Sequence, residues 1–149
     1  MSKIISFRGK LDIGLQDKLN LKTLNGKTGY KITKFQLMST TPGINKYEYI
    51  SQIFKTDQTG SIGTTVDFTD NNLLAVAYLK GTSGANDGAF AEDIIFDNEK
   101  FNQNIFINIT DASGGTVACN YYIELETMTL DDIESSMLTL KSLRTIASQ

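Results

Sequence analysis

The chain contains no histidine and no tryptophan, and it has one cysteine and one proline among 149 residues. Histidine is the commonest general base and the commonest protein ligand for metals, so its absence removes the usual catalytic and metal-binding arrangements. A single cysteine, Cys119, cannot form a disulfide within the chain, which excludes a disulfide-stapled scaffold. We therefore expect a protein that relies on an ordinary hydrophobic core and is not an enzyme.

Long apolar runs and an excess of positive charge are also missing. The longest apolar run, Leu73 to Leu79, is too short to span a bilayer. The first ten residues, MSKIISFRGK, lack the charged head, apolar block and cleavage site of a secretory signal. The net charge is −3, and the sequence shows neither a basic patch nor an aromatic-basic platform for nucleic acid. We expect no membrane contact and no direct nucleic-acid binding.

The clearest pattern lies in the stretch Thr116 to Thr127, where apolar and polar residues alternate. The odd positions are apolar or aromatic: Val117, Cys119, Tyr121, Ile123 and Leu125. The even positions after Ala118 are mostly polar: Asn120, Tyr122, Glu124 and Glu126. A period of two predicts a strand with one buried face and one face in water. A buried free cysteine behaves as a small hydrophobe, so we assign Cys119 to the core and not to catalysis.

Similar patterns predict further strands along the chain. Their ranges are Ile5 to Leu15, Leu19 to Leu24, Tyr30 to Met38, Tyr47 to Lys55, Val66 to Phe68, Leu73 to Leu79, Phe90 to Phe96 and Phe101 to Thr110. Gly9 marks a bulge or a bend in the first of these. The apolar phase slips between Ile32 and Phe35, which a bulge at Thr33-Lys34 explains. The run Leu73 to Leu79 is apolar on both faces and predicts a central strand.

Turn residues connect these strands at intervals of about ten residues. The compact segment Asp111 to Gly115 predicts a hairpin that joins Phe101 to Thr110 with Thr116 to Thr127. Many short strands separated by turns indicate an antiparallel β-sandwich or jelly-roll-like domain. A chain of this length corresponds to a single domain, residues 1–149, with its sheet region over Ile5 to Thr127.

After Met128 the period changes, and we predict a C-terminal helix over Thr129 to Ala147. Apolar residues recur three and four apart: Leu130, Ile133, Met137, Leu140, Leu143 and Ile146. Thr129 is the expected N-cap, with Asp132 reaching back as in a capping box. The charges suit the helix dipole, with Asp131, Asp132 and Glu134 early and Lys141 and Arg144 late. The competing interpretation is a last strand from Met137, because β-branched residues and serines weaken helix propensity.

No group of residues in the sequence forms a catalytic or cofactor site. Glu124 and Glu126 lie side by side on one strand, whereas glycosidase carboxylates face each other across a substrate. Calcium stays a minor alternative at two polar clusters, which lack the spacing of a preformed calcium loop. These clusters are Asp67, Asp70, Asn71 and Asn72, and Asn86, Asp87, Glu92 and Asp93. We assign no catalytic residue, no cofactor and no metal ligand.

For the polar and aromatic residues of the predicted surface, binding to a partner is a better prediction than catalysis. Tyr47, Tyr49 and Tyr122 are candidates for a partner-binding or sugar-stacking face, and Glu124 and Glu126 extend it. Tyrosine is also common on ordinary sheets, so the role of this surface has to come from where the fold places it.

Six segments, in this order and over most of the chain, carry a family resemblance: GYKITKFQLM before a Pro-Gly turn (Gly29 to Gly43), IFKTDQTG (Ile53 to Gly60), VDFTDNNLLAVAYL (Val66 to Leu79), FNQNIFI (Phe101 to Ile107), CNYYIELE (Cys119 to Glu126) and TLKSLR (Thr139 to Arg144). With them the sequence resembles small virion structural proteins of marine tailed bacteriophages. The resemblance implies a non-enzymatic capsid decoration or cement protein, made in the host cytoplasm and located on the capsid surface. It also implies contacts with the major capsid protein or other virion proteins, and a homo-oligomer. A tail or neck component and a carbohydrate- or host-recognition module are the alternatives.

Overall fold

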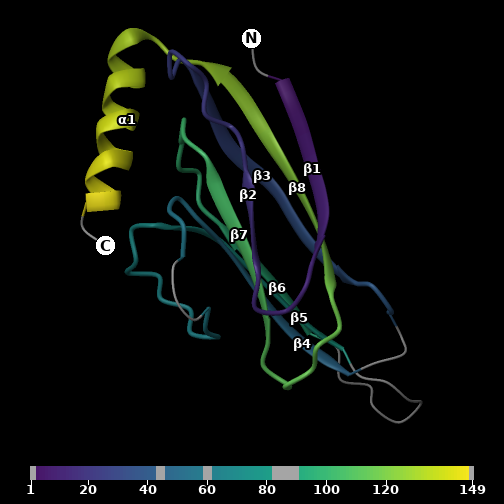
Figure 1. The fold of residues 1–149 in the computed structure, drawn as a ribbon. Coiled ribbons are helices and arrows are strands. Elements are labelled where there is room, and N and C mark those ends of the chain that lie inside the picture. The colour runs from purple at the N-terminus through teal and green to yellow at the C-terminus, as the bar shows by residue number, and fades with distance from the viewer. Residues whose placement is uncertain (1–2, 43–45, 59–61, 82–90, 148–149) are drawn as a thin grey trace.

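A computed structural model describes residues 3–42, 46–58, 62–81 and 91–147 of the chain. The described part is mainly β, with antiparallel sheets and one C-terminal helix, as the sequence predicts (Figure 1). In chain order the elements are β1 (Lys3–Leu11), β2 (Gln16–Leu19), β3 (Thr28–Ser39), β4 (Tyr47–Phe54), β5 (Leu73–Gly81), β6 (Ala91–Phe96), β7 (Ile105–Asp111), β8 (Cys119–Thr129) and α1 (Asp132–Ala147).

The strands form two sheets that share one core. One sheet has the order β1-β8-β3 and the other the order β2-β7-β4-β5-β6, and every paired strand is antiparallel to its neighbour. Phe35, Ile123 and Leu125 from the first sheet belong to the same buried cluster as Ile53 and Ile107 from the second, and all five are at most 1 % exposed. Burial of the inner faces of both sheets is therefore what drives this fold.

Strand β8 confirms the predicted alternation of buried apolar and outward polar residues. It lies between β1 and β3, and its odd positions Cys119, Tyr121, Ile123 and Leu125 are buried. Its even positions are half-buried on the opposite side. The strand begins at Cys119 and not at Thr116, because residues 116–118 belong to the connection from β7.

The single long strand predicted over Ile5 to Leu15 is wrong, because the chain turns after Leu11. Gly14 has a φ of +84°, and the Leu15 N–H donates to the Asp12 carbonyl at 3.2 Å. After this turn β2 joins the other sheet, where it pairs with β7. The side chain of Ile13 still packs against the core, so the apolar alternation continues through the turn and conceals the break.

Gly9 does not mark a bulge, since the register between β1 and β8 is unbroken from Lys3 to Leu11. A Cβ added at Gly9 would lie 2.7 Å from the Tyr121 hydroxyl oxygen. Glycine here leaves room for the Tyr121 ring, whose hydroxyl donates to Asp17 Oδ2 at 3.0 Å. The bulge predicted at Thr33-Lys34 is confirmed by a register shift between Ile32 and Lys34.

The predicted hairpin across Asp111 to Gly115 is also wrong, although the turn is there. Gly114 has a φ of +82°, and Asp111 Oδ1 accepts the Ser113 N–H at 2.9 Å. Strand β7, however, pairs with β2 and β4 in one sheet, whereas β8 pairs with β1 and β3 in the other. The segment therefore carries the chain from one sheet to the other.

Three further strand predictions need correction. Strand β2 ends at Leu19, and the rest of Leu19 to Leu24 leaves the sheet, although Leu21 stays buried. Val66 to Phe68 is an exposed loop. Phe101 forms only an isolated bridge with Tyr30, and the ladder of β7 starts at Ile105.

The remaining strand predictions hold with small changes at their ends. Strand β4 ends one residue before the predicted Lys55, and β6 covers the prediction from Ala91, while Phe90 lies outside the described residues. Strand β5 is almost fully buried between β4 and β6, as expected for a central strand.

The C-terminal helix is confirmed, and the alternative of a last strand from Met137 is wrong. Its N-cap is Asp131 and not Thr129, because Asp131 Oδ1 accepts the Glu134 N–H at 2.7 Å. Thr129 is the last residue of β8 and pairs with Thr28. The ladder thus extends two residues beyond the predicted Thr127, which moves the start of the helix to Asp132.

We predict that Ile123→Ala lowers the free energy of unfolding by about 2–5 kcal/mol, because it removes a fully buried side chain from the shared core. Glu126→Ala on the opposite side of the same strand is the matched control, and its effect should stay below about 1 kcal/mol. Urea unfolding followed by circular dichroism measures both. Similar losses for the two variants would mean that the inner and outer faces of β8 are misassigned.

Candidate interaction sites

Two of the five residues expected at an interface, Tyr47 and Tyr49, lie in the core. Their exposed fractions are 8 % and 0 %, and their rings stack with centroids 4.8 Å apart. The Tyr49 hydroxyl donates to the Val117 carbonyl at 2.9 Å, and burial raises the Tyr49 pKa. Strand β4 lies inside the five-stranded sheet, so its aromatic side chains are needed for packing. The sequence pattern of β4 mixes apolar residues on both faces and does not reveal which of them stay in water.

The other three, Tyr122, Glu124 and Glu126, lie together on the solvent side of the three-stranded sheet, which we call the outer face of this sheet. The strand register places Arg8 and Gln36 on either side of Tyr122, and Ser6 and Lys34 on either side of Glu124. Lys34 Nζ lies 3.9 Å from Glu124 Oε2 and 5.8 Å from the centre of the Tyr122 ring. The acidic middle strand thus runs between two strands that carry basic residues.

A groove of about 850 Å³ opens on this outer face. Its lining includes Arg8, Lys10, Gln36, Met38, Asn120 and Tyr122. Met38 is 62 % exposed, which is unusual for a large apolar side chain. Alternation in the sequence shows that these residues point outward, but only the pairing of β1, β8 and β3 brings them together.

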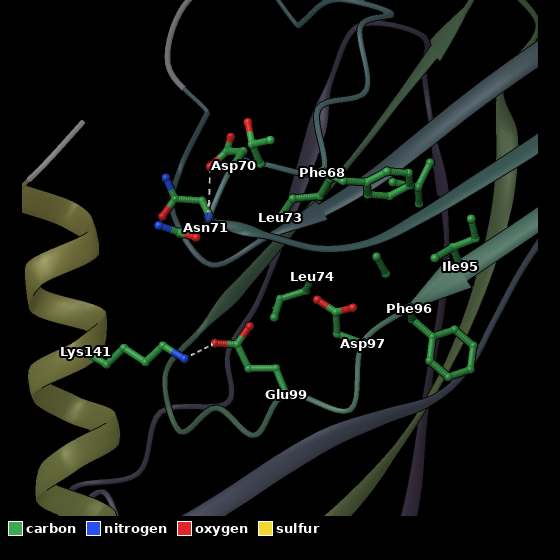
Figure 2. A pocket seen from close by; sticks show the side chains of 14 residues that line it. Phe68, Asp70, Asn71, Leu73, Leu74, Ile95, Phe96, Asp97, Glu99 and Lys141 are labelled. Atoms are coloured by element: carbon green, nitrogen blue, oxygen red, sulfur yellow. Dashed lines mark hydrogen bonds and ion pairs between the residues drawn. The ribbon is translucent and has the colours of Figure 1, made fainter.

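A second groove, of about 940 Å³, lies between the loop before β5, the end of β6 and the helix (Figure 2). Its lining includes Phe68, Asp70, Asn71, Asn72, Ile95, Asp97, Glu99 and Lys141. Phe68 and Ile95 are 66 % and 53 % exposed. Asn72 Oδ1 is buried and has no hydrogen-bond partner. The groove therefore offers apolar surface beside several oxygen acceptors.

The loop that borders this groove is shaped by its aspartates. Asp67 Oδ1 accepts the Thr69 N–H and Asp70 Oδ1 accepts the Asn72 N–H, both at 2.9 Å. The Thr69 hydroxyl, which donates to Asp67 at 2.6 Å, lowers the Asp67 pKa. These are side-chain turns of the kind that aspartate forms in loops.

Glu99 joins the sheets to the helix at the edge of this groove. Lys55 Nζ and Lys141 Nζ lie 2.7 and 2.6 Å from Glu99 Oε1, and the Lys55 side chain is 7 % exposed. Burial raises the Glu99 pKa, but hydrogen bonds and charge from Lys141 and Lys55 outweigh it, so the pKa lies below the usual 4.5. The carboxylate therefore stays ionised and neutralises a nearly buried lysine.

The helix makes further polar contacts with the connections that precede β3 and β7. Ser135 Oγ donates to the Gly26 carbonyl at 2.9 Å, and Asn102 Nδ2 donates to Thr139 Oγ1 at 3.0 Å. The pairs Lys27–Asp132, at 2.8 Å, and Lys100–Glu134, at 3.3 Å, flank these bonds. The helix thus turns its hydrogen-bonding side toward the connections between the strands.

Its apolar side faces away from them. Ile133, Met137, Leu140 and Leu143 are 73, 64, 57 and 56 % exposed, and we call these four residues the outer helix face. Of the predicted stripe, Leu130 is buried just before the helix starts, and the Ile146 side chain lies outside the described part. The periodicity identified the helix but could not show what its apolar side contacts.

The structure describes no further arrangement suited to chemistry. Cys119 is fully buried, and burial raises its pKa to about 12, so the thiol stays protonated. Among the described residues no group of three or more cysteine, aspartate or glutamate side chains could hold a metal ion. Asn86 and Asp87 lie outside the described residues. No helix in the described ranges is long and apolar enough to cross a membrane.

Comparison with known proteins gives little to add to this geometry. No protein-family model and no curated protein matches the chain. A solved structure of disulfide-linked pili from Bacillus endospore appendages is similar at 13 % identity, over 88 % of this chain and 92 % of that chain. Its TM-score of 0.31 is too low to carry any inference about fold or function.

We predict that Glu99→Gln lowers the free energy of unfolding by about 1–3 kcal/mol, because it leaves the Lys55 charge nearly buried and unneutralised. The same substitution at Glu134, in an exposed pair, is the control and should cost less than about 1 kcal/mol. Chemical unfolding at several pH values measures both.

The pH dependence of this difference has a definite sign. Because the Glu99 pKa is lowered in the fold, its contribution is present above 4.5 and is lost as the pH falls through the lowered value. The wild type and Glu99→Gln should therefore converge in stability below pH 4.5. A constant gap down to low pH would contradict the role assigned to the Glu99 charge.

Proposed function

We propose that this chain is a non-enzymatic structural protein of a tailed-bacteriophage virion, and that it decorates and stabilises the capsid surface. The observation that carries the proposal is the outer face of the three-stranded sheet. This face gathers exposed Met38, Tyr122 and the basic residues Arg8 and Lys10 in one groove, and Glu124 lies on the same face beside Lys34. Methionine, tyrosine and arginine are enriched at protein interfaces, and a polar rim commonly surrounds them.

The strand order supports a jelly-roll version of the sandwich. Strand β1 pairs with β8, β2 with β7 and β4 with β5, and β3 contacts β6 between the sheets. Three of the four nested pairs of a jelly roll, a fold that occurs in viral capsid and lectin domains, are thus present as ladders, whereas β6 pairs with β5 and not with β3. A fold alone does not assign a function, so the proposal depends on the surface.

The proposed mechanism is preferential binding to the assembled shell. A rigid two-sheet domain presents its outer face to the major capsid protein or to a neighbouring virion protein. A protein that binds the assembled lattice and not its free subunits stabilises the lattice by mass action. Binding repeated around the particle adds up without requiring a tight individual contact.

We expect the double reversal Glu124→Lys and Glu126→Lys to weaken binding to purified particles by roughly tenfold or more, because it removes the negative charge from the middle of the outer face. Unfolding of the isolated domain should change by no more than about 2 kcal/mol, since the reversal loses one surface ion pair and sets the new lysines opposite Lys34 and Lys31. Co-sedimentation with particles and thermal unfolding measure the two effects.

The matched control is Asp57→Lys with Asp97→Lys, which makes the same change in net charge at exposed positions outside the three-stranded sheet and its groove. Equal loss of binding in the control would show that the effect is one of net charge only. Absence of the chain from purified virions, tested by mass spectrometry, would overturn the proposed function itself.

A carbohydrate- or host-recognition module is the second candidate, and the groove in Figure 2 favours it. Sugars bind where an exposed aromatic ring lies beside hydrogen-bonding side chains, and this groove offers Phe68 next to Asp70, Asn71 and Asp97. The unpartnered Asn72 Oδ1 is an acceptor that a sugar hydroxyl can satisfy.

On this second candidate, Phe68→Ala should abolish any binding found on a glycan array, because it removes the exposed ring of the groove. Leu24→Ala is the control, since Leu24 is fully exposed outside the groove. Calorimetric titration with the glycan that binds would quantify the loss. An array without signal for the wild type, or equal binding by Phe68→Ala, would remove this candidate.

A further inference from the structure

We propose that the groove in Figure 2 recognises a glycan with free amino groups, and that the positive charge of these groups selects it. This specificity rests on the glycan-binding candidate, because it concerns the ligand of the same groove. The capsid-surface role concerns the outer face of the three-stranded sheet and stands or falls independently of both.

The charges at this groove do not cancel. The titratable side chains that line it are Asp70, Asp97, Glu99 and Lys141. Lys141 Nζ lies 2.6 Å from Glu99 Oε1, and Figure 2 shows this pair at the helix side of the groove. No lysine or arginine of the described chain forms an ion pair with Asp70 or Asp97. The groove therefore keeps two carboxylates that no described basic side chain neutralises.

Hydrogen bonds of the backbone fix the positions of these two aspartates. Asp70 Oδ1 accepts the Asn72 N–H at 2.9 Å, and the Asp70 carbonyl accepts the Leu73 N–H at 3.2 Å. At the end of β6 the Asp97 N–H donates to the Leu74 carbonyl, also at 3.2 Å. Both residues are thus held in place before a ligand arrives, which lowers the entropic cost of binding.

Apolar surface beside the carboxylates suits the apolar side of a sugar ring. Phe68 and Ile95 are 66 % and 53 % exposed, which is unusual for large apolar side chains. The amides of Asn71 and Asn72 lie in the same lining and can bond sugar hydroxyls. The volume of about 940 Å³ is that of a common ligand site. Shape and polarity therefore favour a hydroxyl-rich ligand with an apolar side.

A protonated amine fits these features better than a neutral or an acidic sugar does. An ammonium group carries positive charge and three donors, so it can bond carboxylate oxygens and supply the donor that Asn72 Oδ1 lacks. It is also attracted to the face of an aromatic ring such as that of Phe68. An acidic sugar would bring its negative charge toward Asp70 and Asp97, which is unfavourable.

Calorimetric titration with two matched oligosaccharides tests the role of the amine. One probe is a tetramer of glucosamine, whose amines are free, and the other is the tetramer of N-acetylglucosamine, whose amines are blocked. Aspartate is ionised and a primary amine is protonated at about pH 6, so both titrations are made there. We expect the glucosamine tetramer to bind about tenfold more tightly, and its affinity to fall as salt is added.

The double variant Asp70→Asn, Asp97→Asn removes both charges and keeps the shape of the side chains. Asparagine keeps the oxygen that accepts the Asn72 N–H, so the loop should stay folded. Affinity for the glucosamine tetramer should fall about fivefold or more. The matched control, Asp12→Asn with Asp57→Asn, makes the same change in net charge at exposed positions outside the groove. Its affinity should stay within about twofold of the wild type.

The possible failures separate the specificity from the glycan-binding candidate. Equal affinity for the two tetramers, or binding of other glycans without the glucosamine tetramer, would overturn the amine specificity and leave the candidate standing. An equal loss in the control variant, or equally tight binding of a trilysine peptide, would reduce the effect to simple charge attraction and also overturn the specificity. A silent glycan array together with no binding of the glucosamine tetramer would refute both.

Discussion

The alternation along β8 is the constraint on which both sides of the three-stranded sheet depend. Cys119, Tyr121, Ile123 and Leu125 are buried against the other sheet, so register can slip only by exposing all of them at once. Fixing the inner face in this way also fixes the outer one. The outer residues Tyr122 and Glu124 are therefore placed by the hydrophobic core, although they contribute little to it.

The helix is held in place by a different kind of interaction. Its position depends on polar contacts, chiefly Glu99 between Lys55 and Lys141, and not on burial of its apolar side. Ion pairs of this kind add little stability for their number, but they fix orientation. The result is a helix whose large apolar side chains Ile133, Met137, Leu140 and Leu143 stay exposed.

The agreement between the predicted and the observed fold depends on what hydrophobic periodicity can detect. A period of two located the strands and the inner face of β8, and a phase slip located the bulge at Thr33. Periodicity continued through the turn at Gly14, because Ile13 keeps an apolar side chain there for the core. It also could not show that Asp111 to Gly115 leads to another sheet, since turn residues look alike whichever strand follows.

The same limit explains the candidate sites. A binary pattern tells which residues lie on one side of an element, but not what covers that side. Tyr47 and Tyr49 are covered by the core of the protein. Met137 and Leu140 are exposed, and no described part of the chain covers them. Where a pattern predicts burial and the fold supplies no cover, the unmet burial is itself evidence for a partner. That step requires the structure, because only the folded chain shows which apolar faces it has left open.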